Sequence, residues 1–378
     1  MTRPRIGINL LWLLPELAGG AEEYAIRVVR ALDQVAGDGP EITLLCNRRF
    51  PSAYPELTDR FETAIAPIDG GSRSLRIGME STWLVREADR ARLHLVHHLN
   101  NVVPWIRNRP SLLTIHDLRP LVLPGTLGRA HGAYLRSRLG PSVRHSAVIT
   151  TPSAFVRQTV IDLLDADPAR VQVVSAPLFP AEGRPDEGSG AGGIEGRFFI
   201  YPAITNPHKN HGTLLRAFAK VVVDHPDVVL VLTGAEGPAE SAVVDSIAHL
   251  GLRDSVRRLG RVPVARLHAL FRDAAALTYP STYEGFGLPL AEAMAAGCPV
   301  IASNRSALPE VLGDAGMLLD PDDVDGWTEA MVRTLSDEAL RATMIAAGRE
   351  RVRSLTPQET AGRLIGAYRL ALDGGTGH

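Results

Sequence analysis

Two glutamates flank a short glycine-containing stretch in the segment that runs from Tyr279 to Ala302. Glu284 stands in an expected loop, and Glu292 stands about one turn into the helix expected at 289–296. The first amides of a helix have no partners within it and attract a phosphate group. A carboxylate can accept hydrogen bonds from two hydroxyl groups at once. The segment therefore predicts a diphosphate site between two carboxylates that hold sugar and ribose hydroxyls.

Lys209 is one of two lysines in a chain that otherwise uses arginine for its cationic side chains. It follows the first strand expected in the second half, at Phe198–Ala203. A compact ammonium group at such a position is typical of a phosphate contact. We expect Lys209 on an exposed loop, where its substitution would reduce turnover more than stability.

Further candidates lie in the first half of the chain. Gly19 and Gly20 directly precede an expected helix, where glycine lets a ligand approach the backbone and helix amides attract a phosphate. His116, with Asp117 beside it, ends the strand expected at Ser111–His116. An imidazole there can bond a sugar hydroxyl or carry a proton. Ligands of open α/β sheets bind outside the carboxyl ends of the strands, so we expect a site at these positions.

The elements that must position these residues are short apolar runs that alternate with helical patterns, as in parallel sheets covered on both faces. The strands are expected at Gly7–Leu13, Glu41–Asn47, Leu93–Leu99, Ser111–His116, Ala147–Pro152 and Val171–Ala176, and then at Phe198–Ala203, Val228–Thr233, Val256–Leu259, Ala275–Tyr279, Pro299–Ala302 and Met317–Leu319. In the second half, helices are expected at 212–224, 239–250, 264–273, 289–296, 323–335 and 358–372. The pattern predicts an α/β fold with two doubly wound, Rossmann-like domains that face a central cleft.

A stretch rich in glycine and proline, 180–196, separates the two series and cannot hold regular structure. We therefore expect an N-terminal domain at 1–178, a linker and loop at 179–197 and a C-terminal domain at 198–357. A terminal helix that returns to the first domain, with a flexible tail, is expected at 358–378.

The composition excludes several protein classes. The chain has 378 residues, of which 45 % are hydrophobic and 22 % charged, values that are typical of globular proteins. Cys46 and Cys298 have no spacing that indicates a disulfide framework or a zinc site, which favours a reducing, cytoplasmic compartment. The apolar run 6–14 is similar to part of a signal peptide, but it lacks a cleavage site and fits a strand as well.

The segment Glu284-Gly285-Phe286-Gly287-Leu288, followed by Glu292, resembles the signature of the family four retaining glycosyltransferases of the GT-B fold, with seven residues between the two acids. The resemblance covers nearly the whole chain. It implies that Glu284 binds the donor sugar, Glu292 the ribose and Lys209 the diphosphate. It also implies that Gly20 meets the distal phosphate and that His116 is the active-site histidine. The implied catalytic residues are His116, Lys209 and Glu284, and the implied donor-binding residues are Gly19, Gly20, Lys209, Glu284, Gly285, Phe286, Gly287, Leu288 and Glu292.

The implied reaction moves a hexosyl group from a nucleoside-diphosphate sugar to a hydroxyl of a glycan, a lipid or a small molecule, with retention of configuration. GDP-mannose is the first choice of donor and UDP-glucose the second. We expect no cofactor and no metal, because the acidic pairs at 165–167 and 320–323 stand where helix caps are expected. The alternatives are a nucleotide-sugar epimerase of the same fold and an inactive scaffold. A phosphorylase is disfavoured because no lysine is placed to hold pyridoxal phosphate.

The chain departs from the family pattern at one position of the expected donor site. Many members carry an arginine five residues before the lysine, and this chain has Ile204 there. The diphosphate therefore has one cation fewer. Thr205, Asn206 and His208 are the candidates to compensate for it.

A basic segment in the first half suggests an anionic partner. Residues 107–144 contain seven arginines and a single acid, which gives them a charge of +6. The two interpretations are an ordinary solvated face and contact with an anionic membrane or a phosphorylated acceptor. We expect a cytoplasmic protein, and membrane contact would place it at the inner face of the membrane. Nucleic acid is not expected, because no aromatic residues interleave with these arginines in an RNA-binding pattern.

Overall fold

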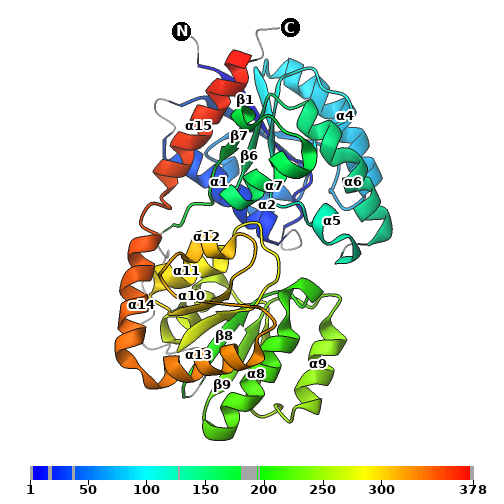
Figure 1. The fold of residues 1–378 in the computed structure, drawn as a ribbon. Coiled ribbons are helices and arrows are strands. Elements are labelled where there is room, and N and C mark those ends of the chain that lie inside the picture. Colours follow the sequence, from blue (N-terminus) through cyan, green and yellow to red (C-terminus); the bar gives the residue numbers. More distant parts are fainter. Residues whose placement is uncertain are drawn as a thin grey trace. The chain divides into compact units, whose positions relative to one another are not determined.

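The computed structural model describes residues 3–15, 19–35, 39–126, 128–179, 194 and 196–374. The chain forms two compact units, each an α/β layer structure (Figure 1). The first unit comprises Met1–Pro177 together with Leu355–His378, and the second comprises Leu178–Ser354. Most of the linker expected at 179–197 lies outside the described residues.

The first unit is built on a parallel sheet with the strand order β3-β2-β1-β4-β5-β6-β7. Its strands are β1 (Arg5–Leu10), β2 (Glu41–Cys46), β3 (Glu62–Ile65), β4 (Leu95–His98), β5 (Ser111–Thr114), β6 (Val148–Thr151) and β7 (Val171–Val173). Its helices are α1 (Gly20–Asp33), α2 (Phe50–Ala53), α3 (Pro55–Thr58), α4 (Arg73–Arg90), α5 (Arg119–Val122), α6 (Arg129–Arg144), α7 (Ala154–Leu164) and α15 (Pro357–Gly374). Six of these strands were expected from the sequence, whereas β3 was not. It is a four-residue edge strand that is largely exposed, so it has no continuous apolar run.

The last helix belongs to the first unit, although the whole second unit separates it from the rest of that unit in the sequence. Helix α15 packs against α1 and against strands β4, β5 and β6, as the red helix in Figure 1 shows. The buried Tyr368 hydroxyl is joined to His97 Nδ1 by a hydrogen bond of 3.0 Å. Thr360 Oγ1 donates to the Ser175 carbonyl at 3.0 Å. Apolar packing and these polar contacts together fix the helix to the sheet.

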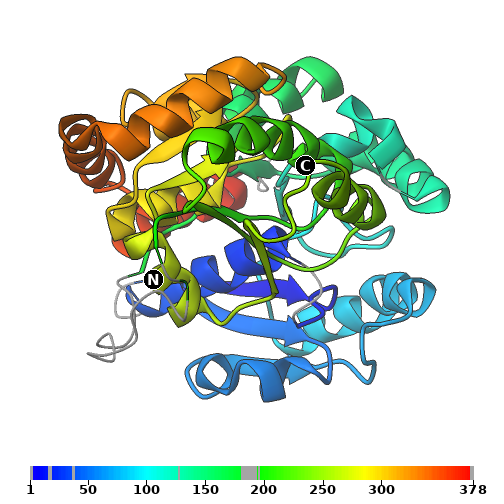
Figure 2. The ribbon, with the colours of Figure 1, turned by 90° about the horizontal axis from the view of Figure 1, so that it is seen from below.

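The second unit has a parallel sheet of six strands in the order β10-β9-β8-β11-β12-β13. The strands are β8 (Phe198–Pro202), β9 (Val229–Thr233), β10 (Val256–Gly260), β11 (Ala276–Tyr279), β12 (Val300–Ser303) and β13 (Met317–Leu319). The helices are α8 (His211–Asp224), α9 (Glu240–His249), α10 (Val264–Asp273), α11 (Leu288–Ala296), α12 (Leu308–Leu312), α13 (Val324–Ser336) and α14 (Glu338–Arg351). The prediction of two doubly wound domains is confirmed, and Figure 2 shows helices on either side of the strands. The sequence prediction missed α12 and α14.

Each sheet has one position where the strand order reverses direction, between β1 and β4 in the first unit and between β8 and β11 in the second. At such a position the loops that leave neighbouring strands run to opposite faces of the sheet and leave a crevice at the carboxyl edge. All the candidate residues follow carboxyl ends of strands. Among the described residues, no helix is both long and apolar enough to cross a membrane.

Candidate active site

Two loops meet at the carboxyl edge of the second sheet, one after β8 and one after β11. The His208 carbonyl, in the first loop, accepts hydrogen bonds from the Thr282 amide at 2.8 Å and the Thr282 hydroxyl at 3.1 Å. The Ser281 hydroxyl donates to the same carbonyl at 3.2 Å. These bonds hold the lysine loop against the glutamate loop.

Lys209 and Glu284 form an ion pair across these two loops. Lys209 Nζ lies 2.5 Å from Glu284 Oε1 and donates to the Tyr279 hydroxyl at 3.1 Å. The two charged side chains are only 15 % and 14 % exposed. The expectation of an exposed lysine is therefore wrong, because a carboxylate from the neighbouring strand end draws the ammonium group inward. An ammonium group has three N–H donors, so one remains for a phosphate oxygen.

The charges in this cluster control its protonation. Burial acts to raise the pKa of Glu284, but the Lys209 charge and the hydrogen bonds from Lys209 and Ser281 outweigh it and hold that pKa below its usual value. Burial raises the pKa of Tyr279 well above its usual value, and the negative charges of Glu284 and Glu292 raise it further. At neutral pH the site thus holds an ionised carboxylate, an ammonium group and a neutral phenol.

Helix α11 starts directly beside this cluster. Gly287 precedes the helix with a φ of 98°, in the left-handed region that favours glycine. A Cβ atom at this position would lie 2.6 Å from Leu308 Cδ2, so the close packing of α12 also requires glycine. Glu292 is partly buried in the second turn of α11. Its negative charge acts on Tyr279, the hydroxyl of which accepts from Lys209. The structure joins Lys209 directly to Glu284, and Glu292 follows in the helix that starts beside them.

Two of the three residues suggested to compensate for the missing arginine have interactions of their own in the structure. Thr205, which follows Ile204, accepts a hydrogen bond from the Gly237 amide at 2.7 Å and donates to Glu240 at 2.8 Å. Its hydroxyl is therefore engaged in joining two loops. Of the three candidates to compensate, His208 is the one whose charge lowers the pKa of Glu284.

His116 lies at the carboxyl edge of the first sheet. Its Nε2 atom lies 2.8 Å from the Leu99 carbonyl, and its backbone amide donates to Asn101 Oδ1 at 2.7 Å. Because a carbonyl can only accept, Nε2 carries the proton in the neutral ring, and the lone pair is on Nδ1. Burial lowers the pKa of His116 despite the opposing effects of the Leu99 bond and the Asp117 charge, which favours the neutral ring.

Helix α1 supports His116 from the side. The ring of Tyr24 meets the His116 ring edge to face with the ring centroids 5.0 Å apart. Tyr24 lies one turn beyond Gly20, where α1 begins, and Gly19 has a φ of 64°. The structure thus brings the predicted glycine pair and the predicted histidine to the same edge of the first sheet. Sequence reasoning missed Tyr24, Leu99 and Asn101, because a ring contact and a carbonyl acceptor leave no motif.

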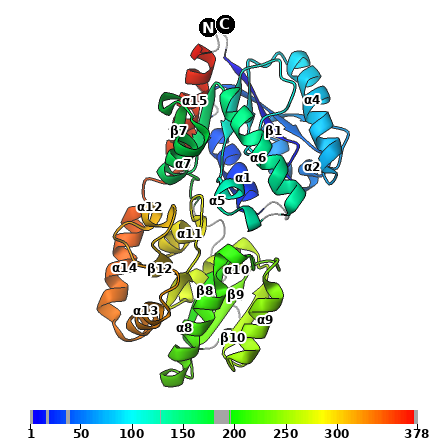
Figure 3. The same cartoon turned by 45° about the vertical axis from the view of Figure 1, so that its right-hand side comes forward.

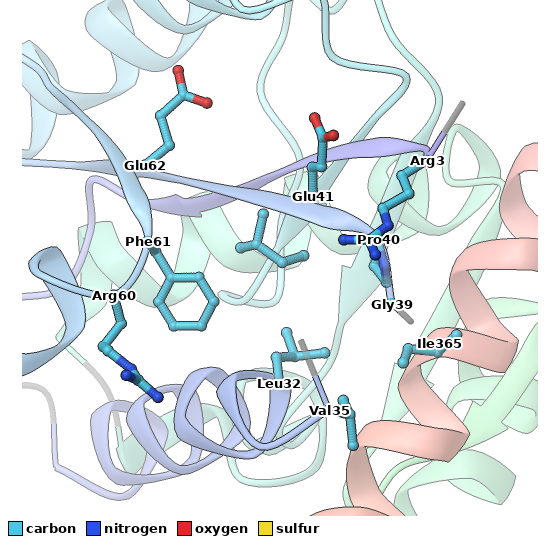
Figure 4. Close-up of a pocket in the computed structure, with 11 residues that line it drawn as sticks. Arg3, Leu32, Val35, Gly39, Pro40, Glu41, Arg60, Phe61, Glu62 and Ile365 are labelled. Atoms are coloured by element: carbon cyan, nitrogen blue, oxygen red, sulfur yellow. The ribbon is translucent and has the colours of Figure 1, made fainter. Parts of the chain in front are cut away.

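A cavity of about 300 Å³ lies at the opposite, amino-terminal edge of the first sheet (Figure 4). Leu32, Phe61 and Ile365 line its apolar part, and Arg3, Glu41 and Glu62 lie at its polar part. The predicted residues lie at the carboxyl edge, so this cavity is separate from them. Among the described residues, no three His, Cys, Asp or Glu side chains gather as a metal site would require.

The basic segment 107–144 contributes fewer free cations than its sequence suggests. Arg138 is buried, and its guanidinium lies 3.6 Å from the centroid of the Trp105 ring. Arg109 forms an ion pair with Asp89 at 2.7 Å. The exposed cations of helix α6 are Arg129, Arg136 and Arg144.

Two family descriptions match the chain. Glycosyltransferase Family 4 matches residues 18–178, and Glycosyl transferases group 1 matches residues 193–351. The two matches coincide with the two structural units and together cover most of the sequence.

Individual proteins are similar over nearly the same length. The O-antigen chain mannosyltransferase B of Escherichia coli is 27 % identical over 372 residues, which are 93 % of this chain and 96 % of that protein. The O-antigen chain mannosyltransferase RfbU of Salmonella typhimurium is 26 % identical, over 82 % of this chain and 86 % of its own. The structure of sucrose-phosphate synthase from Thermosynechococcus elongatus superposes with a TM-score of 0.77 at 20 % identity, over 97 % of this chain and 98 % of that chain.

Proposed function

The chain belongs to the family 4 glycosyltransferases of the GT-B fold, and on that premise we propose that it moves a mannosyl group from GDP-mannose to an acceptor hydroxyl with retention of configuration. Glycosyl transfer is supported by both family matches, and mannose by the names of the two bacterial relatives. The observation that carries the proposal is the cluster of Lys209, Glu284 and Tyr279 beside the start of α11.

We assign the leaving group to Lys209 and the start of α11. As the glycosidic bond breaks, negative charge grows on the diphosphate, and a fixed ammonium group and helix amides stabilise it more as it grows. Glu284 then holds hydroxyls of the donor sugar, and Glu292 holds those of the ribose. The departing phosphate takes the acceptor proton on the same face, so no enzyme nucleophile is required.

We assign His116 to a sugar hydroxyl and the start of α1 to the distal phosphate of the donor. A neutral imidazole with Nδ1 unprotonated can accept a hydrogen bond from a sugar hydroxyl. The backbone at Gly19 and Gly20 can approach the distal phosphate closely. These roles need no divalent cation, because Lys209 and the helix dipole already oppose the diphosphate charge.

The test is transfer with the purified protein, a panel of GDP and UDP sugars and a neutral polyol acceptor. The product is followed by NMR, which reads the anomeric configuration, before and after exhaustive EDTA treatment. We expect GDP-mannose to be preferred, an α-linked product and no loss of rate in EDTA. An inverted product rejects retention, and activity restored only by Mg²⁺ rejects metal independence. Epimerised donor without transfer favours the epimerase, and no turnover with any donor favours a scaffold.

We further propose that the first unit contacts an anionic membrane from the cytoplasmic side. Arg129, Arg136 and Arg144 are exposed on α6, and Trp105 and Ile106 are 61 % and 58 % exposed in the loop before β5. Interfacial tryptophan and basic residues favour the surface of an anionic bilayer. Co-sedimentation with vesicles should require anionic lipid, weaken with salt and weaken in Trp105→Ser. Binding that ignores lipid charge and salt would leave α6 as a solvated face.

A further inference from the structure

Four buried polar side chains connect the last helix of the sequence to the interior of the first sheet. The Tyr368 hydroxyl on α15 lies 3.0 Å from His97 Nδ1, and His97 Nε2 lies 2.7 Å from Thr114 Oγ1. Thr114 Oγ1 is in turn 2.7 Å from Thr150 Oγ1. We call these four residues the polar network. Helix α15, drawn in red, lies beside the strands of the first unit in Figures 1 and 3.

The polar network is closed to solvent, since none of its four side chains is more than 1 % exposed. Burial lowers the pKa of His97 well below its usual value, and the neighbouring His98 and His116 lower it further. The His97 ring is therefore neutral at physiological pH, with one N–H donor and one lone pair. Tyr368 and Thr114 together satisfy both ring nitrogens, and a buried nitrogen without a partner is costly. The orientation of the His97 ring is thus fixed from two sides.

The two residues at the centre of the polar network adjoin the groups that hold His116. Leu99, whose carbonyl is the partner of His116 Nε2, follows His97 by two residues, and His116 itself follows Thr114 by two. The same two segments are joined again by Asn101, whose amide donates to the Thr114 carbonyl at 2.9 Å and whose Oδ1 accepts from the His116 amide at 2.7 Å. The bond between His97 and Thr114 therefore fixes the spacing of the two strand ends from which His116 and its acceptor extend.

Helix α15 has other contacts that dock it on the first unit. The hydroxyl of Thr360 donates to the Ser175 carbonyl at 3.0 Å. The same helix buries apolar side chains at Ala361, Leu364, Ala367 and Ala371. Apolar burial supplies most of the free energy of such packing, whereas one hydrogen bond adds little net stability. The Tyr368 hydroxyl therefore has a more specific effect on the His97 ring than on the attachment of the helix.

We propose that Tyr368 and His97 are positioning residues for His116. The Tyr368 hydroxyl fixes the His97 ring, and His97 fixes Thr114. The two strand ends then hold the Leu99 carbonyl where it accepts the Nε2 proton of His116, so that the lone pair on Nδ1 stays available for a sugar hydroxyl. The role of His116 in transfer rests on the proposed function, whereas its fixed tautomer does not.

The first test reads the tautomer of His116 by ¹⁵N NMR of the full chain with labelled histidine and no substrate. The His116→Gln variant identifies the His116 signals by their loss. The parent protein should show one tautomer, with the proton on Nε2. Tyr368→Phe keeps the ring but not the hydroxyl, and it should show both tautomers because the Leu99 carbonyl is no longer held. Thr114→Val, which breaks the next link, should do the same. The parent tautomer alone in both variants overturns the proposal.

Thr360→Val is the matched control, because it removes a hydrogen bond between the same helix and the same unit that does not lead to His116. It should leave the His116 signals unchanged, and thermal unfolding should show a loss of stability similar to that of Tyr368→Phe. The same tautomer change in the control would reduce the effect to helix docking and overturn the proposal. The double variant Tyr368→Phe, Thr114→Val should change the signals no further than Thr114→Val alone, since both break one network. Additive changes would contradict a single network.

The second test separates this proposal from the proposed function. With GDP-mannose and the neutral polyol acceptor, we expect Tyr368→Phe to lower kcat about 10-fold or more, because a misplaced imidazole slows transfer. GDP affinity should be unchanged, since Lys209 and Glu284 lie in the second unit. Thr360→Val should keep the parent kcat. A parent kcat in Tyr368→Phe overturns the positioning proposal alone. No transfer by the parent from any donor rejects the proposed function, and the NMR spectra then still decide whether the polar network fixes His116.

Discussion

Lys209 Nζ lies 2.5 Å from Glu284 Oε1, so the cation expected to hold the diphosphate and the anion expected to hold the donor sugar form an ion pair with each other. The pair has a structural role in addition to any role in binding. A substitution at either position therefore changes both the free energy of unfolding and the charge of the site.

Removing Lys209 alone should destabilise the protein. Lys209→Met leaves a largely buried carboxylate without its cation, which should lower the free energy of unfolding by about 3 kcal/mol. The double variant with Glu284→Gln should recover much of this loss, because no unpaired charge remains. Urea unfolding measures both values. A double variant no more stable than Lys209→Met would show that the pair is not coupled, while turnover should fall by about 10²–10³ in either case.

Glu292 should control recognition of the ribose. We expect Glu292→Gln to weaken GDP binding about 10-fold and to bind the 2′,3′-dideoxy nucleotide as the parent protein does, because only the parent carboxylate accepts two hydroxyl bonds. Glu284→Gln is the comparison: it should keep GDP affinity and lose discrimination among donor sugars. Calorimetric titration checks both. If Glu292→Gln weakens the binding of GDP and of the 2′,3′-dideoxy nucleotide equally, the role of Glu292 is structural.

Gly287 should be irreplaceable at the start of α11. Gly287→Ala places a side chain at a φ of 98° and against Leu308, so the free energy of unfolding should fall by about 1–3 kcal/mol. GDP affinity should fall as well, because the first turn of α11 must shift. Gly212→Ala is the matched control: its Cβ meets nothing closer than 3.8 Å, and stability should be retained or increased. Thermal unfolding measures the stability of both variants. If Gly287→Ala is as stable as Gly212→Ala, the packing argument is contradicted.

The buried His211 should make stability depend on pH. Burial, with the charges of Lys209 and His208, lowers the pKa of His211 from 6.5 to about 4. Between these values the unfolded chain binds the proton and the folded one does not, so stability is full above pH 6.5 and falls as the pH drops towards 4. One pKa unit corresponds to about 1.4 kcal/mol, which makes the whole effect about 3 kcal/mol.

Replacing the histidine should remove that dependence. His211→Phe keeps a ring beside Tyr201, whose centroid is 4.7 Å away, and has no group to protonate. Urea unfolding at several pH values should give a flatter profile in this variant. His249→Phe, at an exposed position, should keep the parent slope. An unchanged slope in His211→Phe would assign the pH dependence to other groups.

Much of the fold could be predicted, because buried parallel strands are continuous apolar runs, and β8, β9, β11, β12 and β13 of the second unit carry that signal. Strand β10 is the exception, because its two central residues are exposed arginines. Strand β3 was missed since half of its pattern is polar, and α14 was missed because only Met344 and Gly348 are buried among its residues. Helices that bury so little have a weak apolar period.

The candidate site was predicted less completely. Glu284, Glu292 and Lys209 could be found from residue type and spacing, and the structure pairs Lys209 with Glu284. The ion pair between Lys209 and Glu284 could not be predicted from the sequence, because the two residues are 75 positions apart.

The discontinuity of the first unit has a consequence for synthesis on the ribosome. Residues 178–354 form a contiguous unit and can fold as soon as they emerge, whereas the first unit lacks α15, and with it the Tyr368 partner of His97 Nδ1, until the last segment is translated. The usual order, in which the N-terminal domain finishes first, is therefore reversed here. Until then the surface of the sheet that α15 covers stays exposed, which makes the nascent first half a client for chaperones that bind apolar segments.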